Sequence, residues 1–316
     1  MNEKKVVVAI VGDGTEEELW DRDLKALPGV VRVRAGENLE RSLAGIRRRG
    51  ISPAVAIVSS RLYPGSRNLV QLLKRLFPVV EVLLVASADL PLPHLHPLAA
   101  DGVRHLVIRP ASPAVPGAGQ LAPAVNNLLC GRPWQMGDYL LPGTPVHEFL
   151  VRSSDEKEEL IAAVTALVEG GAPERELLRQ KGALLADEML ENALYGAPCT
   201  GSGEKLFSKG ETRLLLPAEQ ILFRFGFDGE TLALEVADSW GSLADGAVVA
   251  HLARNHGAHS FSGEIGGRGF FIIWQFLDQM HVNIVPGRQT VVGGHVRLDS
   301  PFDSPAPKEF HITVQQ

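Results

Sequence analysis

The sequence contains few cysteines and no long hydrophobic run. Its two cysteines, Cys130 and Cys199, lie far apart and lack the spacing to histidine or another cysteine that metal sites use. We therefore expect free thiols and a cytoplasmic protein, since a disulfide framework needs an oxidising compartment. No apolar run approaches the roughly 20 residues that cross a bilayer, so we expect no membrane association. The first apolar run, Val6–Val11, is too short for a signal peptide and predicts a buried strand.

Basic residues are scarce in the C-terminal part of the chain. Residues 1–130 carry 16 Lys+Arg against 12 Asp+Glu, whereas residues 131–316 carry 15 against 25, a net charge of −10. This asymmetry supports two separate units and argues against direct nucleic-acid binding by the C-terminal part. The length of 316 residues also predicts about two domains, at roughly 150 residues each. We interpret the basic cluster Arg47–Arg49 as the solvated end of a helix.

Residues 5–130 alternate strand-like and helical patterns. Such alternation predicts a doubly wound parallel sheet with helices on both faces, whose ligand chemistry gathers at the carboxyl ends of the strands. The strand-like runs are Val6–Val11, Ala54–Val58, Val80–Val85 and His105–Ile108, and the helical patterns are Leu39–Arg48, Arg67–Leu76 and Leu121–Leu129.

The order and spacing over roughly residues 4–128 resemble a response-regulator receiver domain, which has a five-stranded parallel sheet. The family's phosphoaccepting aspartate falls on Ser60, and its acidic pair falls on Gly12 and Asp13. Its switch hydroxyl falls on Ser87, and its Lys-Pro pair is met by Arg109-Pro110. Aspartyl phosphorylation needs a carboxylate nucleophile and oxygen ligands for Mg²⁺, so we expect a pseudo-receiver without phosphotransfer. An unrelated flavodoxin-like domain is the alternative.

Residues 131–150 are rich in proline and glycine and read as an interdomain connection. Trp134, Tyr139 and Leu140 indicate that it packs against a domain and is not a free tether. The expected organisation is a pseudo-receiver domain at 1–130, this linker, and a second domain at 151–316.

Two helices are expected at the start of the second domain, from Ser154 to Val168 and from Glu174 to Tyr195. On the second helix Glu188 and Asn192 are four residues apart and share a face. A carboxylate and an amide stacked this way suit a metal ion and its water beside a nucleotide, although two exposed polar residues would look the same. A buried stripe is expected at Leu178, Leu185, Met189 and Ala193.

Strands are expected to follow these helices. Asp228-Gly229 between two alternating apolar runs is a hairpin signal. The expected strands are Gln220–Phe227, Thr231–Ala237, His281–Val285, Val291–Leu298 and Phe310–Val314, with a helical stretch at Ala247–Asn255.

A glycine-rich turn, Gly266-Gly267-Arg268-Gly269, runs directly into an amphipathic helix. Such a turn is either a tight connection or a phosphate site, because glycine lets the backbone approach a ligand and a helix N-terminus offers unpaired N–H groups. The predicted buried face of the helix consists of Phe270, Ile273, Trp274 and Leu277.

Taken together, these motifs resemble the GHKL ATPase superfamily over about residues 155–298, and the anti-sigma-factor serine kinases in particular. The Glu-x-x-x-Asn-Ala box is met by 188–193, the aspartate-glycine box by Asp238–Gly241, the second glycine box by 267–273, and the closing strand by 289–291. The resemblance implies an α/β sandwich of the GHKL (Bergerat) type.

Roles follow from this resemblance position by position. Glu188 would be the general base, Asn192 would ligate Mg²⁺, and Asp238 would accept a hydrogen bond from the adenine amino group. Residues between Gly241 and Gly266 would form a nucleotide lid. The implied nucleotide-binding residues are Asn192, Asp238, Gly241, Gly267, Arg268, Gly269 and Thr290.

Three positions, Tyr195, Trp240 and Ser242, depart from the family pattern. Trp240 and Ser242 occupy glycine positions of the aspartate box, and Tyr195-Gly196 replaces a histidine-glycine pair. A tryptophan beside the adenine site would be able to fill it.

We therefore expect one of two functions. The first is a bacterial signal-transduction protein in which the receiver-like domain regulates a domain that binds ATP and Mg²⁺. That domain would bind a regulatory protein of the anti-anti-sigma or sigma-factor type and phosphorylate it on Ser or Thr. The second is a non-catalytic interaction scaffold that has lost both chemistries. A homodimer is compatible with either.

Overall fold

The structure, a computed structural model, divides the chain into two compact units, Met1–Pro133 and Trp134–Gln316. Both units are mixed α/β. The described residues are 5–12, 24–27, 29–36, 38–62, 67–87, 98, 101–109, 121–244, 246–249, 268–300 and 308–315.

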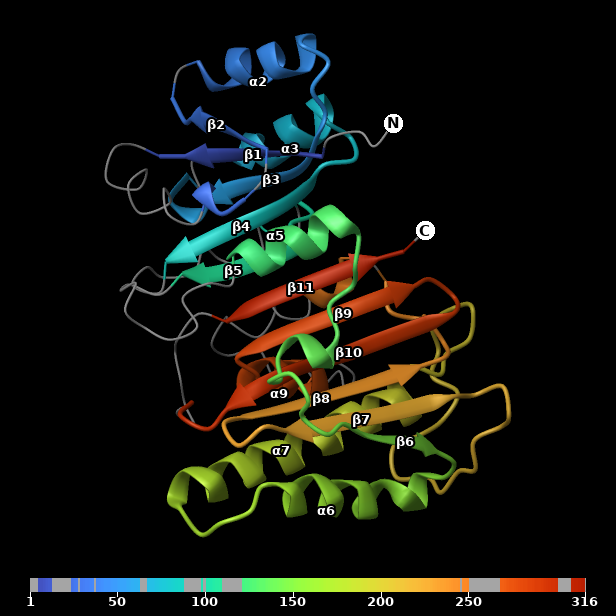
Figure 1. Cartoon of the computed structure of the whole chain (residues 1–316). Coiled ribbons are helices and arrows are strands. Elements are labelled where there is room, and N and C mark those ends of the chain that lie inside the picture. The colour runs from blue at the N-terminus through green and yellow to red at the C-terminus, as the bar shows by residue number, and fades with distance from the viewer. Residues whose placement is uncertain are drawn as a thin grey trace, which may run out of the picture. The chain divides into compact units, whose positions relative to one another are not determined.

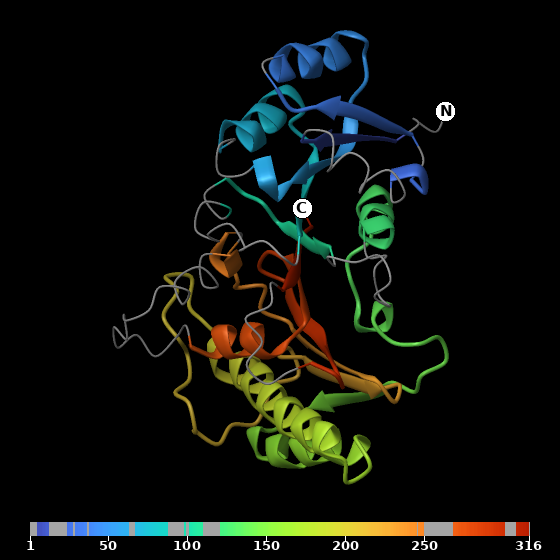
Figure 2. The same ribbon diagram turned by 90° about the vertical axis from the view of Figure 1, so that its left-hand side faces the viewer.

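The first unit contains a parallel sheet in the order β2-β1-β3-β4-β5 (Figure 1). Figures 1 and 2 place α3 and α5 on opposite faces of this sheet. The strands β1, β3 and β4 are almost entirely buried apolar runs, as a parallel sheet covered on both faces requires. The elements are β1 (Val6–Val11), β2 (Val30–Arg34), α2 (Leu39–Arg48), β3 (Pro53–Ser59), the 3₁₀ turn η1 (Ser60–Leu62), α3 (Arg67–Leu76), β4 (Glu81–Ser87), β5 (His105–Arg109) and α5 (Leu121–Cys130).

Strand β2 was not among the runs recognised in the sequence. Its last four residues alternate valine with arginine, and of the whole strand only Val33 is buried. This composition suits the edge of a sheet, where one side faces water. The parallel sheet therefore has the expected five strands, and the fifth is an edge strand with a weak hydrophobic signal.

The second unit contains a mostly antiparallel sheet in the order β11-β9-β10-β8-β7-β6. All neighbouring pairs are antiparallel except β11 and β9, which run parallel. Its strands are β6 (His147–Val151), β7 (Ile221–Phe227), β8 (Thr231–Asp238), β9 (Gln279–Val285), β10 (Gln289–Arg297) and β11 (Glu309–Val314).

The helices of the second unit lie on one face of this sheet, and the short turn η2 lies on the other (Figures 1 and 2). The predicted buried stripe is confirmed, since Leu178, Leu185 and Met189 on α7 and Ala193 on η4 are all buried. The predicted helix 174–195 consists of α7 followed by a π-helical turn, η4. The bounds are η2 (Met136–Asp138), η3 (Ser154–Glu156), α6 (Lys157–Leu167), α7 (Pro173–Glu191), η4 (Asn192–Gly196) and α9 (Arg268–Phe276).

The segment expected as a linker is largely part of the second unit. The boundary between the units falls after Pro133, and Trp134, Met136 and Leu140 are buried. Residues 147–150, which we assigned to the linker from the sequence, belong to the edge strand β6. Here buried apolar contacts outweigh a proline- and glycine-rich composition.

Candidate functional site

A pocket of about 340 Å³ lies in the second unit. This volume is within the range of small-molecule sites. The described residues that line it come from α7 and η4, the loop after η4, the end of β8 and the segment that follows it, α9 and β10. They are Met189, Asn192, Ala193, Gly196, Ala197, Cys199, Gly203, Lys205, Lys209, Val236, Asp238, Ser242, Leu243, Ala244, Ala247, Gly269, Phe270, Ile273, Thr290 and Val292.

The pocket collects residues that are far apart in the sequence. Asp238 and Thr290 are register partners on the adjacent antiparallel strands β8 and β10. Side chains alternate between the two faces of a strand, so Val236 and Val292 point into the pocket with them. The sequence resemblance named Asn192, Asp238, Gly269 and Thr290, and the structure places all four in this one pocket.

Asp238 is a buried carboxylate at the end of β8. Burial raises the pKa of its carboxyl to about 6, even though backbone N–H groups of Trp240, Gly241 and Thr290 donate hydrogen bonds to it. The N–H of Trp240 lies 2.8 Å from Oδ1. A carboxylate held by three backbone donors has a fixed orientation and is positioned to accept a further donor from a ligand.

Gly269 allows the start of α9 to approach α7. A Cβ at this position would lie 2.6 Å from Oε2 of Glu188 and 3.0 Å from Oδ1 of Asn192. Any larger residue would have to push these two side chains aside, so glycine suits the close approach of α9 to α7. The close approach to a ligand that we expect from the sequence stays a prediction. Oε2 of Glu188 and Nδ2 of Asn192 are buried without a hydrogen-bond partner among the described residues. Buried polar atoms of this kind are rare and often belong to a ligand site.

Asn192 opens the π-helical turn η4. The N–H of Ala197 donates to the carbonyl of Asn192 over 2.7 Å, a hydrogen bond that spans five residues. Turns of this kind inside α-helices are frequent at functional sites because they shift side chains out of the regular helical pattern.

Glu188 lies beside the pocket and is partly buried. Burial raises the pKa of its carboxyl, and the nearby ammonium group of Lys209 opposes that rise. A carboxyl with a raised pKa is better matched to proton transfer near neutral pH than an ordinary glutamate.

Gly241 is not among the described residues that line the pocket. Its φ is +55°, and a Cβ there would collide with the backbone of Val285, Gly287 and Arg288. Its N–H donates to Asp238. Gly241 therefore contributes through its backbone: its positive φ lets the chain turn so that its N–H reaches the carboxylate of Asp238.

Neither aromatic departure from the family pattern fills the pocket. Trp240 is not among the described lining residues, which instead include Ser242 and Leu243. Tyr195 is buried, and its hydroxyl donates over 2.7 Å to the carbonyl of Glu211, outside the pocket lining. Trp240 is therefore not part of the described wall of this pocket, and its place beside an adenine stays an expectation.

One wall of the pocket was missed by sequence reasoning. Cys199, Lys205 and Lys209 come from the loop after η4 and line the pocket. The two lysines and two glycines within residues 201–209 are a composition typical of an anion-binding loop. Their spacing follows no helix or strand period, so the sequence did not show that this loop lies beside the other motifs of the pocket. Lys209 also lies 2.7 Å from Oε2 of Glu191.

The remaining expected residues are only partly described. Gly267 and most of the expected lid, residues 250–267, lie outside the described residues. Arg268 begins α9, and its side chain is likewise outside the description. Of the predicted buried face of α9, Ile273, Trp274 and Leu277 are buried, whereas Phe270 is half-buried and lines the pocket.

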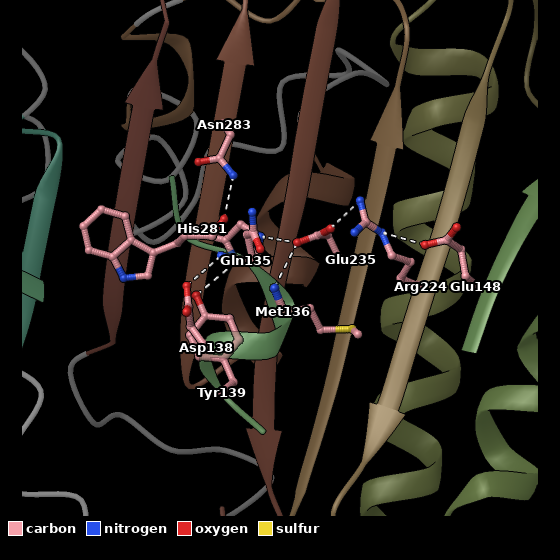
Figure 3. Close-up of polar contacts among 10 residues, drawn as sticks. Gln135, Met136, Asp138, Tyr139, Glu148, Arg224, Glu235, His281 and Asn283 are labelled. Carbon is pink, nitrogen blue, oxygen red and sulfur yellow. Dashed lines mark hydrogen bonds and ion pairs between the residues drawn. The ribbon is translucent and has the colours of Figure 1, made fainter. Parts of the chain in front are cut away.

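The opposite face of the sheet carries a buried polar cluster that the sequence did not reveal (Figure 3). Oε2 of Glu235 accepts a hydrogen bond from the N–H of Met136 over 3.1 Å and lies 3.0 Å from Nε2 of His281. The other nitrogen of His281 lies 3.0 Å from the hydroxyl of Tyr139. Arg224 pairs with the second oxygen of Glu235 at 3.1 Å. This cluster holds the segment 134–140 against the sheet.

In the first unit, the position that the sequence resemblance aligned with a phosphoaccepting aspartate is a buried serine, Ser60. Ser59 ends β3 and Ser60 begins η1, and both are buried. Ser87 and Arg109 are register partners at the ends of β4 and β5. Asp13 and Pro110 lie outside the described residues.

No group of three or more His, Cys, Asp or Glu side chains among the described residues is arranged to hold a metal ion. Within the same residues, no helix is long and apolar enough to cross a membrane. No protein-family model matches the sequence, and no curated protein sequence is significantly similar to it.

Proposed function

We propose that the second unit is a GHKL-type nucleotide-binding domain that takes ATP and Mg²⁺ in this pocket. The observation that carries the proposal is the meeting of Asn192, Asp238, Gly269 and Thr290 around one pocket of about 340 Å³. These residues come from three separate boxes and the closing strand, and nothing in their local sequence requires them to meet.

Asp238 suits the adenine end of such a ligand. Its buried carboxylate is an acceptor, and the exocyclic amino group of adenine is a donor. The hydroxyl of Thr290, buried without a hydrogen-bond partner among the described residues, lies on the neighbouring strand and offers a second polar contact.

The other end of the pocket suits phosphates and Mg²⁺. Asn192 would hold the cation through its amide oxygen, because Mg²⁺ in nucleotide sites is bound by few protein groups and by the phosphates. The start of α9 at Arg268 and Gly269 and the ammonium groups of Lys205 and Lys209 would face the phosphate charge.

Glu188 would act as general base toward an attacking hydroxyl. Its raised pKa and its unpartnered buried oxygen support this role. The proposed activity is a serine/threonine kinase toward a regulatory protein of the anti-anti-sigma or sigma-factor type, in a bacterial cytoplasmic signalling pathway. The first unit would regulate it as a receiver-like domain without a phosphoacceptor aspartate.

Calorimetric titration of the whole chain with ATP and Mg²⁺ tests the proposal. We expect binding that weakens at least tenfold in Asn192→Ala and in Asp238→Asn. The matched control is Asn126→Ala, an exposed asparagine on α5, which should bind as the parent does. Absence of binding at millimolar ATP would reject the nucleotide site.

The two cysteines supply an internal control for location. Cys199 lines the pocket, whereas Cys130 is exposed in the first unit. ATP with Mg²⁺ should slow alkylation of Cys199 by iodoacetamide several-fold and leave Cys130 unaffected. Binding without protection of Cys199 would place the nucleotide elsewhere.

A further inference from the structure

The C-terminal end of α7 is strongly acidic. Asp187, Glu188 and Glu191 lie within about one turn of each other on this helix. The C-terminal end of a helix also carries a partial negative charge of its own. Asn192 follows directly and lines the pocket of the second unit. A phosphate chain in this part of the pocket therefore needs a cation that stays in place.

Two lysines offset this charge, and both pair with the same carboxylate. Oε1 of Glu191 lies 3.1 Å from Nζ of Lys157, and Oε2 lies 2.7 Å from Nζ of Lys209. Nζ of Lys157, at the start of α6, also lies 2.7 Å from Oδ1 of Asp187. The side chains of Glu191 and Lys157 are only 17% and 18% exposed, so salt and water screen this pair less than an ordinary surface pair.

Glu191 is held in its ionised form from two helices. Burial by itself would raise the pKa of its carboxyl, but the hydrogen bonds from Lys209 and Lys157 outweigh burial and keep this pKa below its usual value. The helices α6 and α7 lie side by side (Figure 1), so Lys157 reaches across from one to the other. Both carboxylate oxygens of Glu191 are therefore engaged, and their position is fixed.

The two lysines differ in what else they reach. Lys209 belongs to the loop after η4 and lines the pocket, whereas Lys157 is not among the described lining residues. A lysine on a loop has a long flexible side chain, and fixing it costs conformational entropy. The pairing with Glu191 restricts the Lys209 ammonium in the ligand-free protein, before any anion binds.

We infer that Glu191 is a positioning residue, which holds the ammonium group of Lys209 against the phosphate chain of a bound nucleoside triphosphate. This inference rests on the proposed ATP site. Glu191 is not among the described lining residues and has the same sign of charge as a phosphate, so its contribution goes through Lys209. An ammonium group has three donors, and Lys209 can therefore contact Glu191 and a phosphate oxygen at the same time.

The sign of the change in ATP affinity tests this inference. Glu191→Gln removes a negative charge near the phosphates, so Coulomb attraction alone predicts tighter ATP binding. Positioning predicts the reverse, and we expect Kd to rise at least about threefold in calorimetric titration of the whole chain with ATP and Mg²⁺. The control is Glu176→Gln on the same helix, at an exposed residue that pairs with Arg179 outside the described lining. It makes the same charge change and should alter Kd less than twofold.

A second substitution at the same position keeps the charge. Glu191→Asp shortens the side chain by one methylene group and withdraws the carboxylate from Lys209. It should also weaken ATP binding, although the net charge is unchanged. Urea unfolding of both variants checks that each is folded at the temperature of the titration.

A double-mutant cycle identifies the lysine through which Glu191 acts. In a Lys209→Met background, Glu191→Gln should no longer weaken ATP binding. In a Lys205→Met background it should weaken binding as in the parent, because Lys205 lines the pocket without an ion pair to Glu191.

Tighter or unchanged ATP binding in Glu191→Gln would overturn the inference and leave the ATP site standing. An equal loss of affinity in the Lys209→Met background would overturn it as well. A parent chain that binds no ATP would instead reject the proposed function, and this inference with it.

Discussion

Gly269 and Glu188 meet so closely that a Cβ on the glycine would lie 2.6 Å from Oε2 of the glutamate. The atoms it would displace are the flexible ends of Glu188 and Asn192, not backbone. The cost of a larger residue should therefore fall on the geometry of the site and hardly on stability.

Gly269→Ala should accordingly weaken ATP binding at least tenfold while changing the free energy of unfolding by less than about 1 kcal/mol, since alanine also favours the helix. Calorimetry and urea unfolding measure the two effects. Gly171→Ala, at an exposed position with open space around it, is the control for ATP binding. A large loss of stability with intact binding in Gly269→Ala would contradict this account.

Gly241→Ala should have the opposite profile and destabilise the second unit directly. The position combines a φ of +55° with collisions against backbone atoms that cannot move aside. Gly246 has nearly the same φ, +54°, but open space around it, so Gly246→Ala reports the backbone strain alone. We expect about 1 kcal/mol for Gly246→Ala and at least about 2 kcal/mol more for Gly241→Ala in urea unfolding. Equal losses of unfolding free energy in the two variants would show that the backbone around Gly241 moves to make room for the added Cβ.

Glu235 should be a major determinant of the stability of the second unit. Its removal in Glu235→Ala leaves Arg224, His281 and the N–H of Met136 without their shared acceptor in a buried site, which typically costs about 3–5 kcal/mol. Glu148 contacts the same Arg224 at 3.8 Å but is exposed. Glu148→Ala should cost less than about 1 kcal/mol in the same unfolding experiment. If both variants lost the same amount of unfolding free energy, the contribution would come from the ion pairs of Arg224 and not from the buried hydrogen bonds of Glu235.

The pKa of Asp238 predicts a loss of stability as pH rises. Burial raises this pKa from 3.8 to about 6, so the folded state binds the proton more tightly than the unfolded state. The native state is favoured below pH 4, and this advantage is lost between about pH 4 and pH 6. The change is on the order of 3 kcal/mol. Unfolding of the parent and of Asp238→Asn across this range should diverge by this amount, because the amide does not titrate.

His295 has the opposite effect on stability between pH 4 and about pH 6.5. Burial lowers its pKa to about 4, so the neutral ring stabilises the folded state above pH 6.5, and this contribution is lost as pH falls toward 4. In the parent protein the two effects on the free energy of unfolding partly cancel as pH changes. The difference between the parent and Asp238→Asn isolates the effect of Asp238, because His295 is present in both. A parent and a variant with parallel profiles would refute the raised pKa.

Most helices and strands were predictable from local pattern. The helices Leu39–Arg48 and Arg67–Leu76 have the predicted bounds, and the predicted hairpin is present as β7 and β8. Strands β2 and β6 were not predicted. Both lie at sheet edges, where exposure on one side leaves little hydrophobic signal.

The site was predictable only where a glycine or polar residue stands in a box of fixed spacing. Asn192, Asp238 and Gly269 belong to such boxes. Lys205 and Lys209 do not, because a loop without periodicity gives no indication of the surface it lies against. Glu235 and His281 were missed for a different reason. They alternate with buried apolar residues in their strands, and only the docking of residues 134–140 turns their side of the sheet into a buried one.

The sequence by itself determined the type of most helices and strands, because this depends on side-chain periodicity within a few residues. The tertiary structure decided which ends of those elements meet. Strand register put Asp238 beside Thr290, and the contact of α9 with α7 put Gly269 against Glu188 and Asn192. Such contacts depend on packing between segments far apart in the chain.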